Sequence, residues 1–168
     1  DVILLQETFL KPGKAFKLDG YKVERRDRID GRKGGVATLI RNGINYTVKT
    51  TSGALEALAV EIKSGAGRLT LVNLYIPPVS HPDKTEIGKL LMDLGRNTII
   101  SGDLNAKNPL WGENQTNEHG KIIEELVTEN DWIILNTGQP TYQKHMGGTT
   151  AIDVSIASPE IAAKSTLN

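Results

Sequence analysis

The segment Ile99-Ile100-Ser101-Gly102-Asp103-Leu104-Asn105 joins an apolar run to an aspartate and an asparagine. The apolar part, Thr98–Ser101, predicts a short buried strand. Polar residues that end such a strand lie at the edge of a sheet, where the rigid scaffold behind them keeps their geometry. The segment therefore predicts both a piece of the core and a candidate site at its end.

Three other segments also place acidic or amide groups at the ends of strands. In chain order they are Leu5–Thr8, Val72–Pro78 and Thr149–Ser155. Taken singly, Glu7 fits a turn residue, and Tyr75 fits a packed aromatic side chain with a satisfied hydroxyl. Asp153 is harder to explain in this way, because a carboxylate inside an apolar strand is costly unless it is paired. Residue by residue, a structural and a catalytic interpretation both stay open.

The rest of the chain predicts mostly strands. The expected strands are Val2–Gln6, Gly35–Arg41, Leu55–Lys63, Arg68–Ile76, Thr98–Ser101, Trp132–Asn136 and Thr149–Ala157, with a hairpin turn at residues 64–67. Two helices are expected between them. Asp83 caps the first, with Glu86 as its reciprocal partner, and the second runs from about Asn117 to Glu129. Pro159–Lys164 is expected to start a final helical turn.

Strands in hairpins with two inserted helices indicate an α+β layered sandwich rather than a sheet with regular βαβ alternation. No linker or repeat divides the chain, so residues 1–168 are expected to form one domain. There is no cysteine, which excludes disulfide scaffolds, thiol nucleophiles and thiolate zinc sites. No apolar run approaches the roughly 20 residues that a membrane span needs, so no membrane partner is expected.

Charge is balanced overall but not along the chain. The 20 Lys and Arg residues match 20 Asp and Glu residues, which argues against a nucleic-acid binder that works by bulk charge. Basic residues are concentrated in Lys22–Lys33. This segment is either a solvated hairpin or an edge that contacts phosphate groups.

Four motifs, taken together and in order, match a known pattern. Gln6-Glu7-Thr8, Asn73–Pro78, Gly102–Asn105 and Ile152–Val154 resemble the endonuclease/exonuclease/phosphatase superfamily, which includes deoxyribonuclease I. The longer strings Gly102–Gly112 and Gly147–Asp153 resemble the endonuclease domain of non-LTR (LINE-type) retrotransposons. The resemblance covers almost the whole chain, and four ordered motifs are much more specific than Gly-Asp-x-Asn alone.

The resemblance implies a deoxyribonuclease I-like fold, a two-layer β-sandwich flanked by helices, with the active site at one end of the sheets. It implies an endodeoxyribonuclease that cleaves a DNA phosphodiester with Mg²⁺ or Mn²⁺. Glu7 is expected to bind the metal, and Asp103 to accept a proton from the attacking water or to align it. Asn105 is expected to bond the scissile phosphate or the water, and Tyr75 to contact the phosphate. Asp153 is expected to orient a histidine.

These roles agree with elementary chemistry. A phosphodiester is anionic, so a cation is needed to neutralise the charge that develops during attack. Mg²⁺ prefers oxygen ligands, keeps several waters and needs one or two protein carboxylates. An aspartate that is ionised near neutral pH can then act as the base.

The chain also departs from the family pattern. The family has an asparagine on a strand before Gln6-Glu7-Thr8 and a Ser-Asp-His motif near the C-terminus, and this sequence contains neither. We therefore expect a fold that lacks the first and last strands, truncated at both ends. His81 and His145 are expected in loops rather than as substitutes. Two alternatives to a nuclease stay open: a catalytically incompetent remnant that acts as a binding module, and a superfamily phosphatase.

The expected partner is DNA, bound by a monomer that belongs to a longer polyprotein with a reverse transcriptase. The resemblance also implies a nuclear location. The balanced charge predicts modest DNA affinity with a shallow dependence on salt. The candidate DNA contacts lie in the basic segment, beside the Gly-Asp-x-Asn motif and in the loop Tyr142–Gly148; they are Arg25, Arg26, Arg28, Lys33, Asn108 and Lys144.

Overall fold

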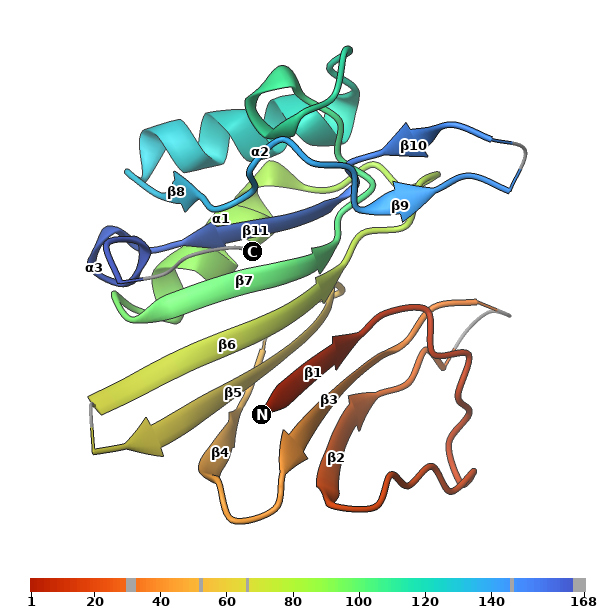
Figure 1. Ribbon diagram of the computed structural model, residues 1–168, viewed down its shortest axis with the longest axis vertical. Helices are drawn as coiled ribbons and strands as arrows, with labels where there is room; N and C mark the ends of the chain where they lie inside the picture. Colours follow the sequence, from red (N-terminus) through yellow and green to blue (C-terminus); the bar gives the residue numbers. More distant parts are fainter. Residues whose placement is uncertain (30–32, 52, 66, 146, 165–168) are drawn as a thin grey trace.

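A computed structural model of the chain describes residues 1–29, 33–51, 53–65, 67–145 and 147–164. Within these residues the strands form two sheets and a separate hairpin (Figure 1). The small sheet has the order β1-β3-β2, with β1 (Val2–Leu5), β2 (Tyr21–Arg26) and β3 (Val36–Arg41). The hairpin pairs β9 (Tyr142–Gln143) with β10 (Thr149–Thr150).

The large sheet has the order β4-β5-β6-β7-β11-β8. Its strands are β4 (Asn45–Lys49), β5 (Glu56–Ser64), β6 (Gly67–Tyr75), β7 (Thr98–Asp103), β8 (Ile133–Ile134) and β11 (Asp153–Ala157). Among the described strands, β6 and β7 are the parallel pair, and such a pair needs a crossover connection. The helix α1 (Lys84–Asp93) supplies it. The parallel pairing brings the carboxyl ends of β6 and β7 to the same edge.

The described residues contain three further helical segments. They are η1 (Pro109–Trp111), a single 3₁₀ turn, α2 (Glu118–Glu129) and α3 (Pro159–Ala162). Asp83 caps α1 by accepting a hydrogen bond from the Thr85 amide, and Asn117 caps α2 by accepting one from the Gly120 amide. No described helix is long and apolar enough to span a bilayer.

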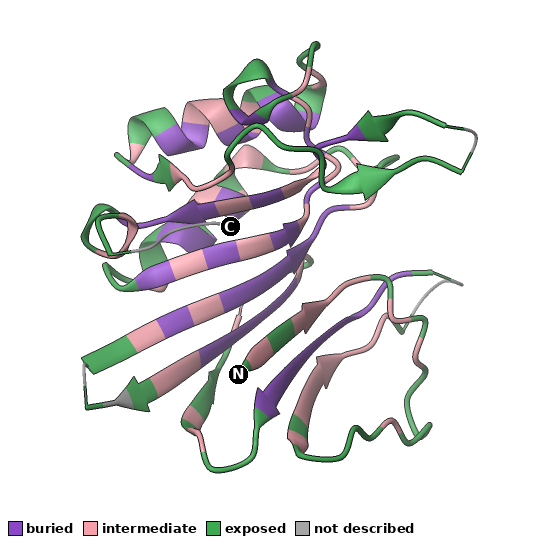
Figure 2. Ribbon diagram, viewed as in Figure 1, coloured by how far each residue is buried: buried purple, intermediate pink, exposed green. Residues whose placement is uncertain are grey.

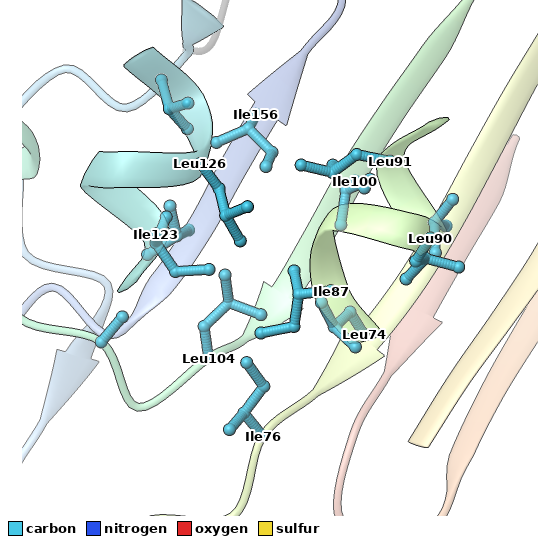
Figure 3. Close-up of a cluster of buried hydrophobic side chains, with 14 of the residues drawn as sticks. Leu74, Ile76, Ile87, Leu90, Leu91, Ile100, Leu104, Ile123, Leu126 and Ile156 are labelled. Carbon is cyan, nitrogen blue, oxygen red and sulfur yellow. The ribbon is translucent and has the colours of Figure 1, made fainter. Parts of the chain in front are cut away.

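The large sheet is covered on both faces. On one face, α1 and α2 bury an apolar core against β6, β7 and β11, which includes Leu74, Ile100 and Ile156 (Figure 3). On the other face, the small sheet packs through β3, where Val36 forms a cluster with Leu58 and Tyr75. Figure 2 shows buried positions along β3 and the middle strands of the large sheet, whereas the β9–β10 hairpin is mostly exposed. The expected α+β sandwich with flanking helices is confirmed.

Two glycines permit close backbone contacts near the motif. A Cβ at Gly102 would lie 1.9 Å from the carbonyl oxygen of Leu74, so only glycine lets β7 approach β6 this closely. A Cβ at Gly120 would lie 1.8 Å from the carbonyl oxygen of Lys107. The first turn of α2, which contains Gly120, therefore packs directly on the segment that follows the Gly-Asp-x-Asn motif.

Some local predictions were wrong. Glu86 does not close a capping box with Asp83, because its Oε1 accepts hydrogen bonds from the amides of Ala54 and Leu55. The single strand expected over Thr149–Ala157 is interrupted at residues 151–152, where the chain leaves the hairpin and enters the large sheet. The strand expected over Trp132–Asn136 is reduced to β8.

Candidate active site

The four motif segments converge at one end of the two sheets. Asp103 is the last residue of β7, and Asp153 is the first residue of β11, directly opposite it in the antiparallel pairing. Tyr75 ends β6, and Glu7 follows the end of β1. In Figure 1 the ends of β1, β6 and β7 and the start of β11 lie on the same side. The fold thus brings together four side chains that are distant in the sequence.

Glu7 and Tyr75 form the first pair of the site. The Tyr75 hydroxyl donates a 2.6 Å hydrogen bond to Oε1 of Glu7. Burial raises the pKa of the Tyr75 hydroxyl well above its ordinary value, and the bond to Glu7 raises it further. Tyr75 therefore stays a neutral donor. It is only 2% exposed, so its position suits holding Glu7 better than reaching a phosphate.

The backbone around Glu7 adopts an unusual conformation. Glu7 and Phe9 have positive φ angles of 49° and 53°. This conformation is costly for residues other than glycine and persists where neighbouring structure fixes it. Here the amides of Thr8 and Phe9 donate to the carbonyls of Gly35 and Gly34, at 3.2 and 3.0 Å. The result is an exposed Glu7 carboxylate held at the end of the small sheet.

Asp103 is the strongest candidate for a base. Burial raises the pKa of its carboxyl group to about 6, and the charges of Asp153 and Glu7 raise it as well. The Asn105 amide opposes this by donating a 3.0 Å hydrogen bond to Oδ1 of Asp103. A half-buried carboxyl group with a pKa near neutrality can both take up and release a proton at physiological pH.

Asn105 is tied into the site by its own backbone and side chain. Its φ angle is +45°, and its Nδ2 donates a 3.0 Å hydrogen bond to the carbonyl oxygen of Ile76. The Nδ2 of Asn117, the cap of α2, donates in turn to the Asn105 carbonyl at 2.8 Å. The side-chain Oδ1 of Asn105 has no hydrogen-bond partner among the described residues. Asn105 therefore presents an oxygen acceptor rather than a free amide donor.

Asn73, the first residue of the motif Asn73–Pro78, joins the two sheets behind the site. It is fully buried, and its Nδ2 donates to the carbonyls of Leu5 in β1 and Ala37 in β3, at 3.0 and 2.9 Å. Its Oδ1 accepts a 2.6 Å hydrogen bond from Gln6. This single amide fixes the small sheet, and with it Glu7, relative to β6.

The three histidines differ in their surroundings. His81 and His145 are exposed and lie outside helices and strands, as expected. His119 is buried on the inner face of α2, where a positive charge on its ring would lower the pKa of Asp103. Sequence reasoning missed it, although its spacing from Ile123 and Leu126 matches one helix face. Within the described part of the chain, Asp153 forms no hydrogen bond with a histidine.

The donor set suits a hard divalent cation, although the described residues contain no group of three or more His, Asp or Glu side chains that could hold a metal. Glu7 is exposed and uses one carboxylate oxygen for Tyr75. The charges of Glu7 and Asp153 both act unfavourably on ionised Asp103. A cation would relieve this repulsion, and Mg²⁺ needs only one or two protein carboxylates because it keeps its waters.

The arginines of the basic segment that the structure describes are engaged within the protein. Arg25 forms an ion pair with Asp27 at 3.1 Å. Arg26 donates to the Thr51 hydroxyl and to the carbonyls of residues 53 and 57. Arg28 pairs with Glu56, and its guanidinium carbon lies 6.0 Å from the centre of the Tyr75 ring. The charges of these three arginines are therefore used in contacts within the protein.

Among the other candidate DNA contacts, Lys33 and Lys144 are exposed. The structure argues against Asn108. Its side chain is 2% exposed, its Oδ1 caps η1 by accepting from the Leu110 amide, and its Nδ2 donates to Glu124 at 2.7 Å. Both polar atoms are therefore used inside the protein. The part of the basic segment at residues 30–32 lies outside the described residues.

Comparisons with known proteins identify relatives of the chain. The "RNA-directed DNA polymerase from mobile element jockey" of Drosophila funebris is 27% identical over 148 residues, which are 86% of this chain and 16% of that protein. The "Probable RNA-directed DNA polymerase from transposon X-element" of Drosophila melanogaster is 30% identical over 145 residues, or 84% and 16%. The chain thus spans about a sixth of the length of these curated relatives.

A solved structure shares the fold. It is the endonuclease domain of TRAS1, a telomere-specific non-LTR retrotransposon, with a TM-score of 0.79 and 21% identity over 95% of this chain and 72% of that one. The family model described as "Endonuclease-reverse transcriptase" matches residues 69–168, which include Asp103, Asn105 and Asp153. The match covers more than half of the sequence, and the chain therefore belongs to the endonuclease–reverse transcriptase family.

Proposed function

We propose that this chain is a metal-dependent DNA endonuclease domain that nicks target DNA for retrotransposition. The observation that carries the proposal is the convergence of Glu7, Asp103 and Asp153 at one end of the sandwich, where the pKa of Asp103 is raised to about 6. Membership of the endonuclease–reverse transcriptase family supports the same reaction class.

Each residue of the site has a proposed role. Asp103 aligns the attacking water and accepts its proton, because its raised pKa suits proton transfer near neutrality. The Asn105 side chain orients the water through its Oδ1. Tyr75 is a positioning residue that holds Glu7 through a 2.6 Å hydrogen bond. The charge of Asp153 adds to the effect of burial in raising the pKa of Asp103.

Glu7 is the residue that would hold Mg²⁺ or Mn²⁺. When bound, such a cation supplies positive charge that stabilises the negative charge developing on the phosphate. The exposed carboxylate of Glu7 suits this hard ion.

DNA is the proposed partner, with Lys33 and Lys144 as its exposed contacts. Lys144 lies on the β9–β10 hairpin, whose second strand leads directly to Asp153. Lys33→Ala and Lys144→Ala are each expected to weaken duplex binding. Each should also reduce the slope of log binding constant against log salt concentration by about 1, the value for one lost phosphate contact. Lys89→Ala, an exposed lysine on α1, is the matched control and should bind as the unaltered chain does.

A plasmid-nicking assay tests the function. We expect supercoiled DNA to become open-circular with Mg²⁺ or Mn²⁺ and to stay supercoiled with EDTA. Asp103→Asn should abolish nicking, whereas Asp93→Asn, an exposed aspartate at the end of α1, should not change it. DNA binding without any metal-dependent nicks would instead favour a binding module.

The context of the chain is part of the proposal. The matched relatives are named as RNA-directed DNA polymerases, and this chain spans 16% of their length. We therefore propose that it functions within a polyprotein that also carries a reverse transcriptase and reaches nuclear DNA. The neighbouring coding sequence tests this, since a downstream open frame without reverse transcriptase motifs would contradict it.

A further inference from the structure

His119 is a buried titratable group to which the roles above assign nothing. It is 4% exposed and lies on the inner face of α2, with Ile123 and Leu126. A buried imidazole needs hydrogen-bond partners for its ring nitrogens, because an unpaired polar group inside a protein is costly. Whether those partners donate or accept hydrogen bonds determines which protonation form of the ring fits them.

Both ring nitrogens face backbone carbonyl oxygens. Nδ1 lies 3.0 Å from the Leu104 oxygen, and Nε2 lies 2.9 Å from the Ser80 oxygen. A carbonyl oxygen only accepts hydrogen bonds, so each contact needs an N–H on the ring. Neutral imidazole carries one N–H, and imidazolium carries two. Turning the ring over would place carbon atoms at both contacts, so the recorded orientation is the one that pairs both oxygens.

The two carbonyls belong to the two loops that bear the site. Leu104 lies between Asp103 and Asn105. Ser80 lies in the loop that follows Tyr75, where its amide and hydroxyl both donate to the Pro77 carbonyl, at 3.1 and 2.6 Å. The imidazole thus spans from the turn with the candidate base to the loop after the residue that holds Glu7.

We propose that His119 is a positioning residue whose imidazolium form ties the Asp103–Asn105 turn to the loop after Tyr75. This inference rests on the proposed nuclease function. The ring binds no substrate and transfers no proton. Instead, it fixes two backbone segments in the relative position that aligned attack on a phosphodiester requires.

An imidazolium ring at this position would act on Asp103. Asp103 is the acidic group on which the ring acts: burial raises the pKa of Asp103, and the charge of His119 opposes that rise. Glu118, the residue before His119 on α2, faces His81 instead, at 3.2 Å. The positive ring therefore helps to keep the base ionised without neutralising it through a direct ion pair.

Nuclear magnetic resonance of the unaltered chain tests the protonation state directly. With ¹⁵N-labelled histidine at about pH 7.5, where an ordinary exposed imidazole is neutral, both nitrogens of His119 should show the protonated pattern. His145, exposed in a turn, gives a comparison signal in the same spectrum. A signal from an unprotonated ring nitrogen of His119 would overturn the proposal. This measurement does not depend on whether the chain cleaves DNA.

Kinetics of two variants test the positioning role. His119→Gln can donate to one carbonyl but sets its own oxygen against the other, whereas His119→Arg offers only donors. We expect His119→Gln to lower kcat about tenfold or more with KM changed less than about twofold, and His119→Arg to recover part of kcat. His81→Gln, at an exposed loop histidine, is the control. Unchanged kcat in a folded His119→Gln variant would overturn the role. Absence of nicking by the unaltered chain would defeat the proposed function and leave the protonation result standing.

Discussion

Asp153 stands directly opposite Asp103, where β11 begins and β7 ends. Like charges at facing positions of two strands repel each other. Burial is the largest cause of the raised pKa of Asp103, and the charge of Asp153 is a further cause. The pairing continues just beyond the strands, where the Leu104 amide donates to the Ile152 carbonyl at 3.1 Å. The backbone therefore holds the two carboxylates together against their repulsion.

Replacement of Asp153 should lower the pKa of Asp103. Asp153→Asn keeps the size of the side chain but removes its negative charge, which favours ionised Asp103. We expect the pKa to fall below about 6 and to stay above the ordinary aspartate value of about 3.9, since burial is the larger cause. Titration of carboxyl ¹³C signals in EDTA measures it, with Asp93→Asn as control. An unchanged Asp103 midpoint would show that the two charges are not coupled.

Asp103→Asn should make the protein more stable at neutral pH. The pKa of Asp103 is higher in the folded state than in the unfolded state, so ionised Asp103 destabilises the folded protein above about pH 6. This destabilisation disappears as the pH falls below about 4, where the carboxyl group is protonated in both states. We expect a gain of about 1–2 kcal/mol in the free energy of unfolding at neutral pH, after an allowance for solvent screening. Urea denaturation at several pH values measures it. A gain that persists at about pH 3 would contradict the linkage.

Two tyrosine–glutamate pairs allow a matched test of Tyr75. The Tyr46 hydroxyl donates to Glu24 at 2.6 Å, the same distance as in the pair between Tyr75 and Glu7. Loss of either hydroxyl should cost about 1 kcal/mol of stability. Tyr75→Phe should also reduce nicking, because Glu7 loses the donor that orients it, whereas Tyr46→Phe should not. Equal nicking by both variants would remove Tyr75 from the site.

Much of the site could be predicted from the sequence because its residues end apolar strands. Strands β1, β6 and β7 follow directly from apolar or alternating runs, and their last residues lie at the same end of the two sheets. The two faces of β6 pack against different layers: Leu74 lies in the helical core, while Tyr75 packs with Val36 and Leu58.

Other features depend on long-range contacts that leave no local pattern. Strand β2 carries several charged side chains, and one of them, Arg26, donates to carbonyls and a hydroxyl of residues 51–57, far along the chain. Glu86 left its expected capping role for the same reason, since the amides of Ala54 and Leu55 lie within its reach. Asn108, beside the motif, was assigned to DNA, but burial gives it a structural role.

Glu113 joins the segment after η1 to the base of the β9–β10 hairpin. Its Oε1 accepts hydrogen bonds from the Thr150 hydroxyl and the Ala151 amide, both at 2.6 Å. Burial alone would raise its pKa, but these two bonds, with the charges of Lys107 and Lys144, lower it. The carboxylate therefore fixes the chain two residues before Asp153.

Glu113→Ala should loosen this junction and destabilise the protein. The change leaves the Ala151 amide and the Thr150 hydroxyl without their acceptor, which should lower the free energy of unfolding by about 1–3 kcal/mol at neutral pH. A carboxyl group with a lowered folded pKa stabilises the protein above the unfolded value of about 4.3, so the difference should shrink as the pH falls below it. Glu118→Ala, at an exposed position on α2, should change stability by less than about 0.5 kcal/mol. Urea denaturation at about pH 7 and about pH 3 measures both variants. Equal stabilities of the two variants at neutral pH would mean that the hairpin base holds Asp153 in place without Glu113.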